Sequence, residues 1–169
     1  RDNLGLPDTQ ITNNRENQLK LIHLIRRYQP DIVLTSHWDT KHPDHIAASY
    51  LVTDSCHFAG LINIDTGQER WRPYQVMYFH LPHYVNPSFI VDITEVYAER
   101  MNAIAAYQSQ FSQELYPQYL SNALSAPLFL KHIESRTRYY GSLINVEFAE
   151  AFYIKNHLEI KNPVGFFVP

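Results

Sequence analysis

The sequence predicts an α/β fold, and three consecutive segments carry that prediction. An amphipathic helix is expected over residues 15–28, where apolar side chains recur every three or four positions. The short run Ile32-Val33-Leu34 follows, and its β-branched character is typical of a strand buried on both faces of a parallel sheet. A polar loop and a second helix, over residues 43–58, come next. Strand, loop and helix in this order form half of a β-α-β unit, so we expect a sheet flanked by helices.

The ends of both helices are readable from single residues. Asn13 or Asn14 is the expected N-cap of the first helix, and Pro30 ends it. Pro43 suits the first position of the second helix because its fixed φ is already helical, and that helix should end before Gly60. The loop between strand and helix lies at the carboxyl end of the strand, where open α/β sheets bind their ligands.

The rest of the chain alternates between further strands and helices. Asp92 and Glu95 resemble a capping box at the start of the third helix, and Gly141 is the expected end of the fourth. The expected elements are strands at 75–81 and 89–93, a helix at 94–110, a surface loop at 112–127, a helix at 130–140 and a last strand at 148–154.

Composition sets limits on partners and location. The 169 residues, 45% of them apolar, suit a single domain with a real core. Fourteen basic against 17 acidic residues argue against a nucleic-acid or anionic-membrane binder, and no apolar run is long enough to span a membrane. A single cysteine, Cys56, excludes an internal disulfide and a thiolate metal cluster, so we expect a cytoplasmic protein. Because the chain opens with Arg1 and without a signal region, it is either processed or a piece of a longer protein.

The motif His42-Pro43-Asp44-His45 is the sharpest chemical feature. Its two histidines, three apart at a helix N-terminus, can point the same way, and imidazole is the commonest neutral metal ligand. A helix N-terminus also favours an oxyanion or a metal-bound hydroxide, and Asp39 can join the surrounding shell. The alternative interpretation is that Asp44 interacts with the helix N-terminus and both histidines are solvated. The tetrapeptide alone leaves both open.

No third zinc ligand stands out beside these histidines, although catalytic zinc sites usually have three protein ligands and a water. His37, His80 and His83 are the remaining candidates, with surface or hydrogen-bonded roles as the simpler interpretation of the last two. Arg72 can clamp a carboxylate or phosphate, or lie on the surface as an ordinary arginine. Cys56 is expected to be a buried structural thiol.

Several short blocks follow one another in a familiar order, separated by the predicted helices and strands. They are Leu4-Gly5-Leu6-Pro7-Asp8, Asp39-x-x-His42-Pro43-Asp44-His45, Ala106-Tyr107-Gln108-Ser109-Gln110-Phe111, Tyr140-Gly141 and Glu147-x-Ala149-Glu150-x-Phe152. In this order they resemble the LmbE-like (PIG-L) family of zinc-dependent N-acetylglucosamine deacetylases, most closely the bacillithiol-biosynthesis branch. The resemblance covers nearly all 169 residues.

The resemblance implies a Rossmann-like, mostly parallel sheet with Zn²⁺ at its carboxyl edge. It implies hydrolysis of the acetamide of a small-molecule N-acetylglucosaminyl conjugate, expected to be N-acetylglucosaminyl malate. By position, His45 matches the family's zinc-ligand histidine, and His42 the histidine that stabilises the tetrahedral oxyanion, which we expect to be protonated. Asp44 matches the carboxylate that orients His42, and Arg72 an active-site arginine of the branch that can contact a substrate carboxylate.

Three departures from the family pattern shape the prediction. The family's other zinc ligands and catalytic aspartate lie in a His-Pro-Asp-Asp block after the first strand, and this chain has no such block. We therefore expect residues 1–169 to be the C-terminal two-thirds of a single deacetylase domain, without its first strand or strands and inactive alone. Thr40 stands where an acidic residue is more usual, and Phe129 where the branch has a tyrosine nearby.

Two other functions stay open at this point. A degenerate homologue would act as a sugar-binding or assembly module without catalysis. A metal-dependent phosphoesterase would need a second metal about 4 Å from the first and more carboxylates than the motif offers. The aromatic content, 14% of the residues, can also supply an interface, so a homo-oligomer is possible.

Overall fold

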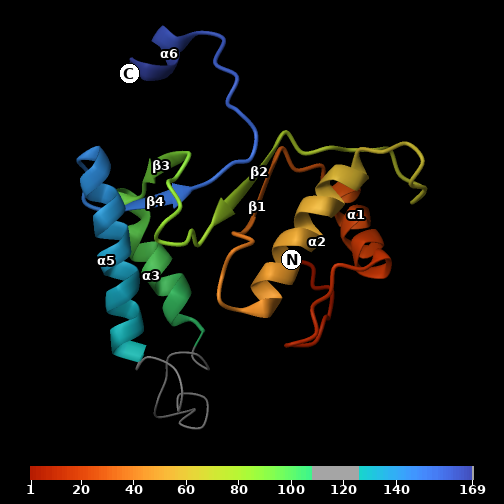
Figure 1. The fold of residues 1–169 in the computed structure, drawn as a ribbon, viewed down its shortest axis with the longest axis horizontal. Helices are drawn as coiled ribbons and strands as arrows, with labels where there is room; N and C mark the ends of the chain where they lie inside the picture. Colours follow the sequence, from red (N-terminus) through yellow and green to blue (C-terminus); the bar gives the residue numbers. More distant parts are fainter. Residues whose placement is uncertain (108–125, 169) are drawn as a thin grey trace. The chain divides into compact units, whose positions relative to one another are not determined.

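The computed structural model describes residues 1–107 and 126–168. The chain divides into two compact units, and each is described by itself. Unit 1 comprises Arg1–Ser88 and Phe152–Pro169, and unit 2 comprises Phe89–Ala151. Figure 1 shows the order of the elements along the chain.

Unit 1 contains the β-α-β half-unit that the sequence predicts. Its elements are α1 (Arg15–Tyr28), β1 (Ile32–Ser36), α2 (Pro43–Ala59), β2 (Gln75–Phe79) and the short α6 (Pro163–Phe167). Strands β1 and β2 pair in parallel, with Ile32 opposite Gln75 and Ser36 opposite Phe79. The predicted α/β class with a parallel sheet and flanking helices is confirmed.

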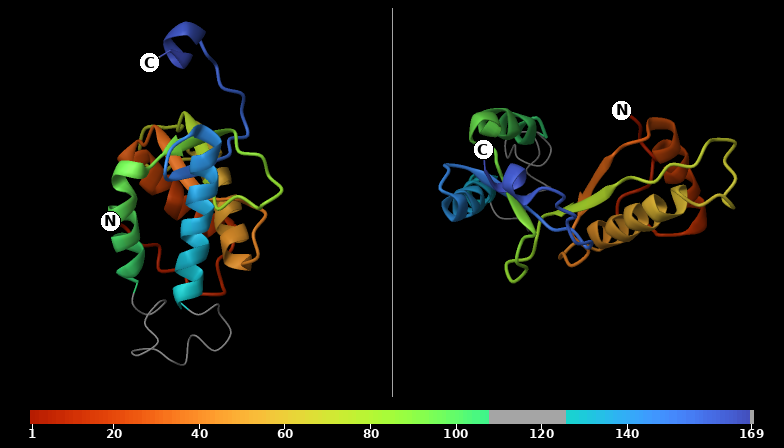
Figure 2. Two further views of the ribbon diagram at one scale, coloured as in Figure 1. Left: turned by 90° about the vertical axis from the view of Figure 1, so that its left-hand side faces the viewer. Right: turned by 90° about the horizontal axis from the view of Figure 1, so that it is seen from above.

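The core of unit 1 lies between these strands and the two helices, which lie side by side (Figures 1 and 2). Val33 and Val76, neighbours in the β1–β2 register, pack against a buried cluster. That cluster consists of Ile22, Ile25, Cys56, Ala59 and Ile64. On the opposite face of β1, Ile32 and Leu34 are 47% and 53% exposed. The prediction that this strand is buried on both faces is therefore wrong for the described residues, which cover one face only.

Local sequence sets the ends of the first helix. The Asn14 side chain accepts a hydrogen bond from the Asn17 N–H at 2.9 Å, which confirms an asparagine N-cap. At the other end Gln29 adopts a left-handed conformation (φ 48°), and its N–H donates to the Ile25 carbonyl.

A buried arginine ties the loop after α2 to α1. Arg26 is 4% exposed, and its guanidinium donates to four oxygens at the end of α2 and in this loop. The acceptors are the carbonyls of Ala59 (3.0 Å), Leu61 (2.8 Å) and Ile64 (2.6 Å) and the Thr66 hydroxyl (2.7 Å). The planar fork of an arginine can satisfy several carbonyls at once, so Arg26 acts as an internal cross-link.

Unit 2 contains two paired strands and the helices α3 and α5. Its elements are β3 (Phe89–Asp92), the 3₁₀ turn η1 (Thr94–Val96), α3 (Tyr97–Ala105), α5 (Ala126–Ile144) and β4 (Ala149–Phe152), whose last residue falls in unit 1. Strand β3 pairs with β4, and α5 packs against β3. The Tyr97 and Phe148 rings stack with their centroids 3.6 Å apart.

Two predicted helix ends in unit 2 are wrong. Helix α3 is preceded by a 3₁₀ turn without a capping box, because the Asp92 carboxylate accepts the Thr94 N–H at 2.9 Å instead. Helix α5 runs through Gly141, where a β-carbon would come within 2.6 Å of the Val146 carbonyl oxygen. Gly141 therefore does not end the helix; its missing side chain lets the backbone at Val146 pass close to α5. The predicted loop at 112–127 lies outside the described residues except at 126–127, which belong to α5.

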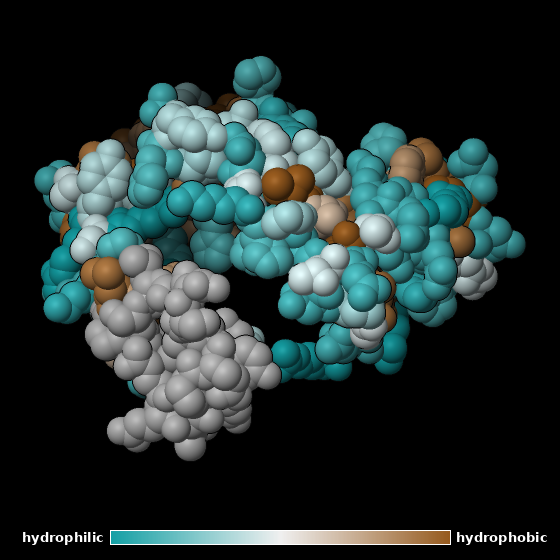
Figure 3. All heavy atoms as spheres, turned by 60° about the horizontal axis from the view of Figure 1, so that its bottom comes forward, coloured by the Kyte–Doolittle hydropathy of each residue, from teal (hydrophilic) through white to brown (hydrophobic). Residues whose placement is uncertain are grey.

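The surface visible in Figure 3 is mostly hydrophilic, with hydrophobic residues in small separate patches. None of the helices in the described ranges is both long enough and apolar enough to cross a membrane.

Candidate active site

The predicted motif occupies the loop between β1 and the first turn of α2, at the carboxyl end of β1. His42 is the N-cap of α2 and Pro43 its first residue. The His42 carbonyl accepts the N–H groups of His45 (3.0 Å) and Ile46 (3.2 Å), which fixes the turn. The His42 and His45 rings stack with centroids 4.9 Å apart and planes 29° apart. The structure thus brings together the two histidines that the spacing predicts to share a face.

The hydrogen bond to the His42 ring determines where its proton lies. Nδ1 of His42 accepts the backbone N–H of Asp44 at 3.2 Å, as the side-chain cap of the helix. A ring nitrogen that accepts a hydrogen bond has no proton, so the neutral imidazole carries its proton on Nε2. His42 can therefore donate from Nε2 without becoming an imidazolium. A protonated His42 during the reaction stays a prediction, and an imidazolium would give up this cap.

Asp44 contacts a different partner from the one expected. It is 6% exposed, and its carboxylate accepts the N–H of Thr9 at 2.7 Å. Thr9 belongs to the turn before α1 and has a left-handed backbone (φ 64°). Asp44 thus holds that turn against the start of α2, and its link to His42 is through its backbone N–H.

His45 is the other histidine of the pair, and its ring does not cap the helix. The Ser36 hydroxyl donates to the His45 carbonyl at 2.8 Å, which ties the first turn of α2 to the end of β1. Within residues 1–107 and 126–168, no hydrogen bond engages its ring nitrogens, and its side chain is exposed. His45 can therefore offer a ring nitrogen to a metal or a substrate.

His37 directly follows β1 and is buried. It is 2% exposed, stacks on Trp38 at 3.9 Å, and accepts the Asp39 N–H on Nδ1 at 3.1 Å. Burial lowers the pKa of His37, and the Asp39 hydrogen bond opposes that shift. Nε2 of His37 has no hydrogen-bond partner among the described residues.

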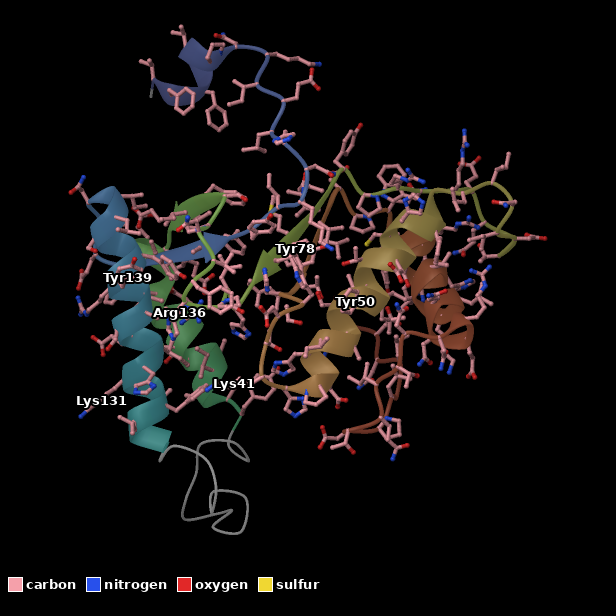
Figure 4. All side chains as sticks on the ribbon, in the orientation of Figure 1. Lys41, Tyr50, Tyr78, Lys131, Arg136 and Tyr139 are labelled. Atoms are coloured by element: carbon pink, nitrogen blue, oxygen red, sulfur yellow. The ribbon has the colours of Figure 1, made fainter. Side chains whose placement is uncertain are left out.

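A contact between Trp38, which follows His37, and Lys155 is not among the predictions from the sequence. The Lys155 ammonium lies over the Trp38 ring, 4.3 Å from its centroid, and 5.2 Å from that of Tyr78. Tyr78 is labelled on β2 in Figure 4. Its hydroxyl shares a hydrogen bond of 2.8 Å with Thr53 of α2, and its backbone forms an antiparallel bridge with Tyr153. No local signal in the sequence points to this cluster, since its members come from separate segments.

The described residues do not by themselves complete a zinc site. No group of three or more His, Cys, Asp or Glu side chains lies close enough together, among the residues searched, to hold a metal ion. A catalytic zinc takes three protein ligands. Nδ1 of His42 is engaged by the helix N-terminus, whereas no hydrogen bond engages the ring of His45 among the described residues.

The structure does not bring Arg72 to the two histidines. Nη2 of Arg72 donates to the His57 carbonyl at 3.1 Å, in the last turn of α2, and its side chain packs on Gly60. His42 caps the other end of the same helix, and a helix of 17 residues is about 25 Å long. Thr40 donates to the His42 carbonyl at 3.4 Å, and Phe129 is exposed on α5.

Comparison with known families identifies relatives of this chain. The family model described as "PIG-L: GlcNAc-PI de-N-acetylase" matches residues 1–56. Diacetylchitobiose deacetylase of Thermococcus kodakarensis is 27% identical over 154 residues, which are 87% of this chain and 53% of that protein. The chain thus spans about half the length of this curated relative.

Solved structures extend the likeness to the whole fold. The conserved protein TT1542 of Thermus thermophilus is 30% identical with a TM-score of 0.81, covering 94% of this chain and 67% of its own. N,N'-diacetylchitobiose deacetylase of Pyrococcus horikoshii, solved with an inhibitor, is 27% identical with a TM-score of 0.69. The match covers 87% of this chain and 54% of that deacetylase. The hydratase GalB of Pseudomonas putida shares the fold, with a TM-score of 0.71 and 20% identity. That match covers 93% of this chain and 65% of GalB. With its motif at the start of α2 and these relatives, the chain belongs to the PIG-L family.

Proposed function

We propose that this chain carries the oxyanion-binding part of a deacetylase that removes the acetyl group from an N-acetylglucosaminyl conjugate. The observation that carries the proposal is the hydrogen bond from the Asp44 N–H to Nδ1 of His42, which leaves a proton on Nε2 beside the exposed ring of His45. Two relatives are deacetylases of an N-acetylated sugar by name.

The roles of the residues follow from their positions. Nε2–H of His42 donates to the acetyl oxygen as that oxygen becomes an anion, and the N-terminus of α2 favours the same charge. Asp44 keeps the first turn of α2 fixed by holding the Thr9 N–H. A donor held in place before the reaction stabilises the transition state without reorganisation, so rigidity here serves the rate.

His45 is the proposed protein ligand of a zinc ion. When bound, zinc polarises the acetyl carbonyl and lowers the pKa of a bound water. The remaining ligands and the general base would come from outside the described residues, in a preceding segment with a His-Pro-Asp-Asp block. The length of the relatives supports this part of the proposal, as does the apolar face that Ile32 and Leu34 leave open on β1.

The finer assignments are proposals of the same kind. We propose N-acetylglucosaminyl malate as the substrate, the cytoplasm as the location, and a single deacetylase domain of which residues 1–169 form the C-terminal two-thirds. A homo-oligomer fits the exposed aromatic side chains of Tyr74, Tyr84 and Phe167. Contact between Arg72 and a substrate carboxylate stays a prediction, and within one copy Arg72 lies at the far end of α2 from His42.

The test compares this chain with one extended upstream in its reading frame to the length of its relatives. We expect the extended chain to hold about one zinc per chain and to release acetate from N-acetylglucosaminyl malate, and this chain to do neither. In the extended chain, His45→Ala should lose zinc. His42→Ala should keep zinc but lower kcat by roughly 10²- to 10³-fold, because one oxyanion donor is removed.

His23→Ala is the matched control, since His23 is an exposed histidine on α1. It should change neither zinc content nor kcat. Full activity of the His42→Ala enzyme would contradict the proposed role of His42. An extended chain that binds one zinc but releases no acetate would favour the sugar-binding module, and two metals per chain would favour the phosphoesterase.

A further inference from the structure

A pocket of about 270 Å³ lies in unit 1, away from the His42–His45 pair. It is bounded by the later turns of α2, by the segment that enters β2, and by the residues that follow β4. Its polar lining includes Thr53, His57, Arg72, Tyr78, Lys155 and Asn156. This volume is slightly below the range of pockets that hold drug-sized ligands, so it suits a small molecule.

The charged side chains among the described lining residues are both cations. Arg72 and Lys155 line the pocket, whereas none of its described lining residues is Asp or Glu. Neither cation forms an ion pair within residues 1–107 and 126–168. Asp54, next to Thr53 on α2, is engaged by the side-chain amide of Asn13 at 2.7 Å. Two cations in one pocket without a described carboxylate partner create a site of positive potential.

The Arg72 guanidinium is held in place by its neighbours, but its hydrogen bond to His57 engages only one of its N–H groups. Its Nη2 donates to the His57 carbonyl at 3.1 Å, and a β-carbon on Gly60 would collide with Nε and Cβ of Arg72. A guanidinium has five N–H donors, and this contact uses one. Gly60 and His57 thus fix the orientation of a fork whose other donors remain open to a ligand.

Lys155 is positioned by aromatic rings in place of an anion. Its ammonium lies 4.3 Å from the Trp38 centroid and 5.2 Å from that of Tyr78. A cation–π contact engages the charge through the ring face and leaves N–H donors for other acceptors. The Tyr78 hydroxyl, hydrogen-bonded to Thr53, fixes that ring between Lys155 and α2.

From this arrangement we infer that the pocket binds a small molecule carrying anionic oxygens, a carboxylate or a phosphate, between Arg72 and Lys155. The planar fork of Arg72 suits two oxygens of one anionic group, and Lys155 provides a point charge for another. The inference goes beyond the proposed deacetylation and rests on residues outside the His42–His45 motif. It shares with the proposed function only the predicted contact of Arg72 with a carboxylate, and it stands without that substrate because Lys155 completes the pocket.

The experiment titrates inorganic phosphate and, separately, succinate into the 169-residue chain at low salt. Binding is followed by NMR through the Nε–H signal of Arg72 and the indole signal of Trp38. We expect a saturable shift of both signals with at least one probe, because the ligand engages the guanidinium and moves Lys155 relative to Trp38. Tighter binding of phosphate identifies a phosphate ligand, and tighter binding of succinate a dicarboxylate.

Variants separate this pocket from general surface charge. Arg72→Gln and Lys155→Gln should each weaken binding at least about tenfold, since each removes charge-assisted hydrogen bonds. Gly60→Ala should weaken binding as well, because the added methyl group displaces Arg72. Arg70→Gln, at an exposed arginine outside the lining, is the control for the loss of one charge.

Circular dichroism establishes that each variant is folded before its affinity is compared. The inference is overturned if neither probe gives a saturable shift. It is also overturned if folded Arg72→Gln and Lys155→Gln bind as tightly as Arg70→Gln. Failure of the deacetylase assay leaves these results unaffected, because the probes contain no acetamide.

Discussion

Replacement of Arg26 by methionine should be among the most destabilising single changes in unit 1. Arg26 is 4% exposed, and its guanidinium makes four hydrogen bonds, one to the last residue of α2 and three to the loop after it. A net value of about 1 kcal/mol for each bond gives a loss of about 4 kcal/mol. Methionine has a similar length and fills much of the same space, so the loss reflects the carbonyls that are left without a donor.

This loss is large in relation to the total stability of a domain, which is about 5–15 kcal/mol. Arg26→Lys should recover part of it, because an ammonium restores the charge but cannot reach all four acceptors from one position. Arg27→Met is the matched control. The side chain of Arg27 is 59% exposed and lies 4.0 Å from Asp2, so its replacement should cost less than about 1 kcal/mol.

The assay is urea unfolding at pH 7, followed by far-ultraviolet circular dichroism. The order of stability should be wild type, Arg27→Met, Arg26→Lys and Arg26→Met, from highest to lowest. If Arg26→Met unfolds at the same urea concentration as Arg27→Met, the cross-link contributes nothing net, and the reasoning about buried carbonyls is refuted.

Three further predictions concern buried groups. Burial raises the pKa of Cys56 from an ordinary value near 9.0 to about 12, so the stability that the neutral thiol contributes is complete below pH 9 and lost as the pH rises. Urea unfolding from pH 8 to 10 should show this loss, about 1.4 kcal/mol per unit above pH 9, in wild type but not in Cys56→Ala. Burial lowers the pKa of His37, so its contribution is present above pH 6.5 and lost as the pH falls, because the unfolded chain takes up the proton first. The stability of wild type should therefore fall more steeply than that of His37→Phe between pH 7 and 5, and parallel curves would contradict the burial of a neutral ring. Gly141→Ala should cost about 1–3 kcal/mol in thermal or urea unfolding, because its methyl group meets the Val146 carbonyl, whereas the exposed Ser142→Ala should cost less.

Local sequence patterns predict the helices and strands of this fold better than they predict what packs against each of them. The strand at Ile32 and the cap at Asn14 follow from neighbouring residues, and the structure contains both. The prediction that Gly141 ends a helix is wrong, because the sequence cannot distinguish a glycine that ends a helix from one that lets another backbone segment pass close by. The open face of β1 could not be foreseen from the apolar run, since burial depends on what packs against the strand.

The same distinction applies to the candidate site. The stacking of His42 and His45 follows from a three-residue spacing at a helix start, which is a local property. The carboxylate of Asp44 instead reaches Thr9, far from it in sequence, and Arg72 returns to the opposite end of α2. The contact of Lys155 with Trp38 is likewise set by the tertiary fold. No spacing rule covers such pairs.

The division of unit 1 into two stretches of chain has a consequence for the order of folding. Tyr78 exchanges backbone hydrogen bonds of 2.8 and 2.9 Å with Tyr153, so β2 receives this partner only after all of unit 2 has been synthesised. On the ribosome, α1 and α2 can form early from local contacts, and β1 can pair with β2 once residues 75–79 have been made. The edge of β2 that pairs with Tyr153 stays unpaired until later. Closing so long a loop is slow compared with helix formation. Until Tyr153 has been synthesised and pairs with β2, this edge of the nascent chain can pair wrongly with another strand or another chain.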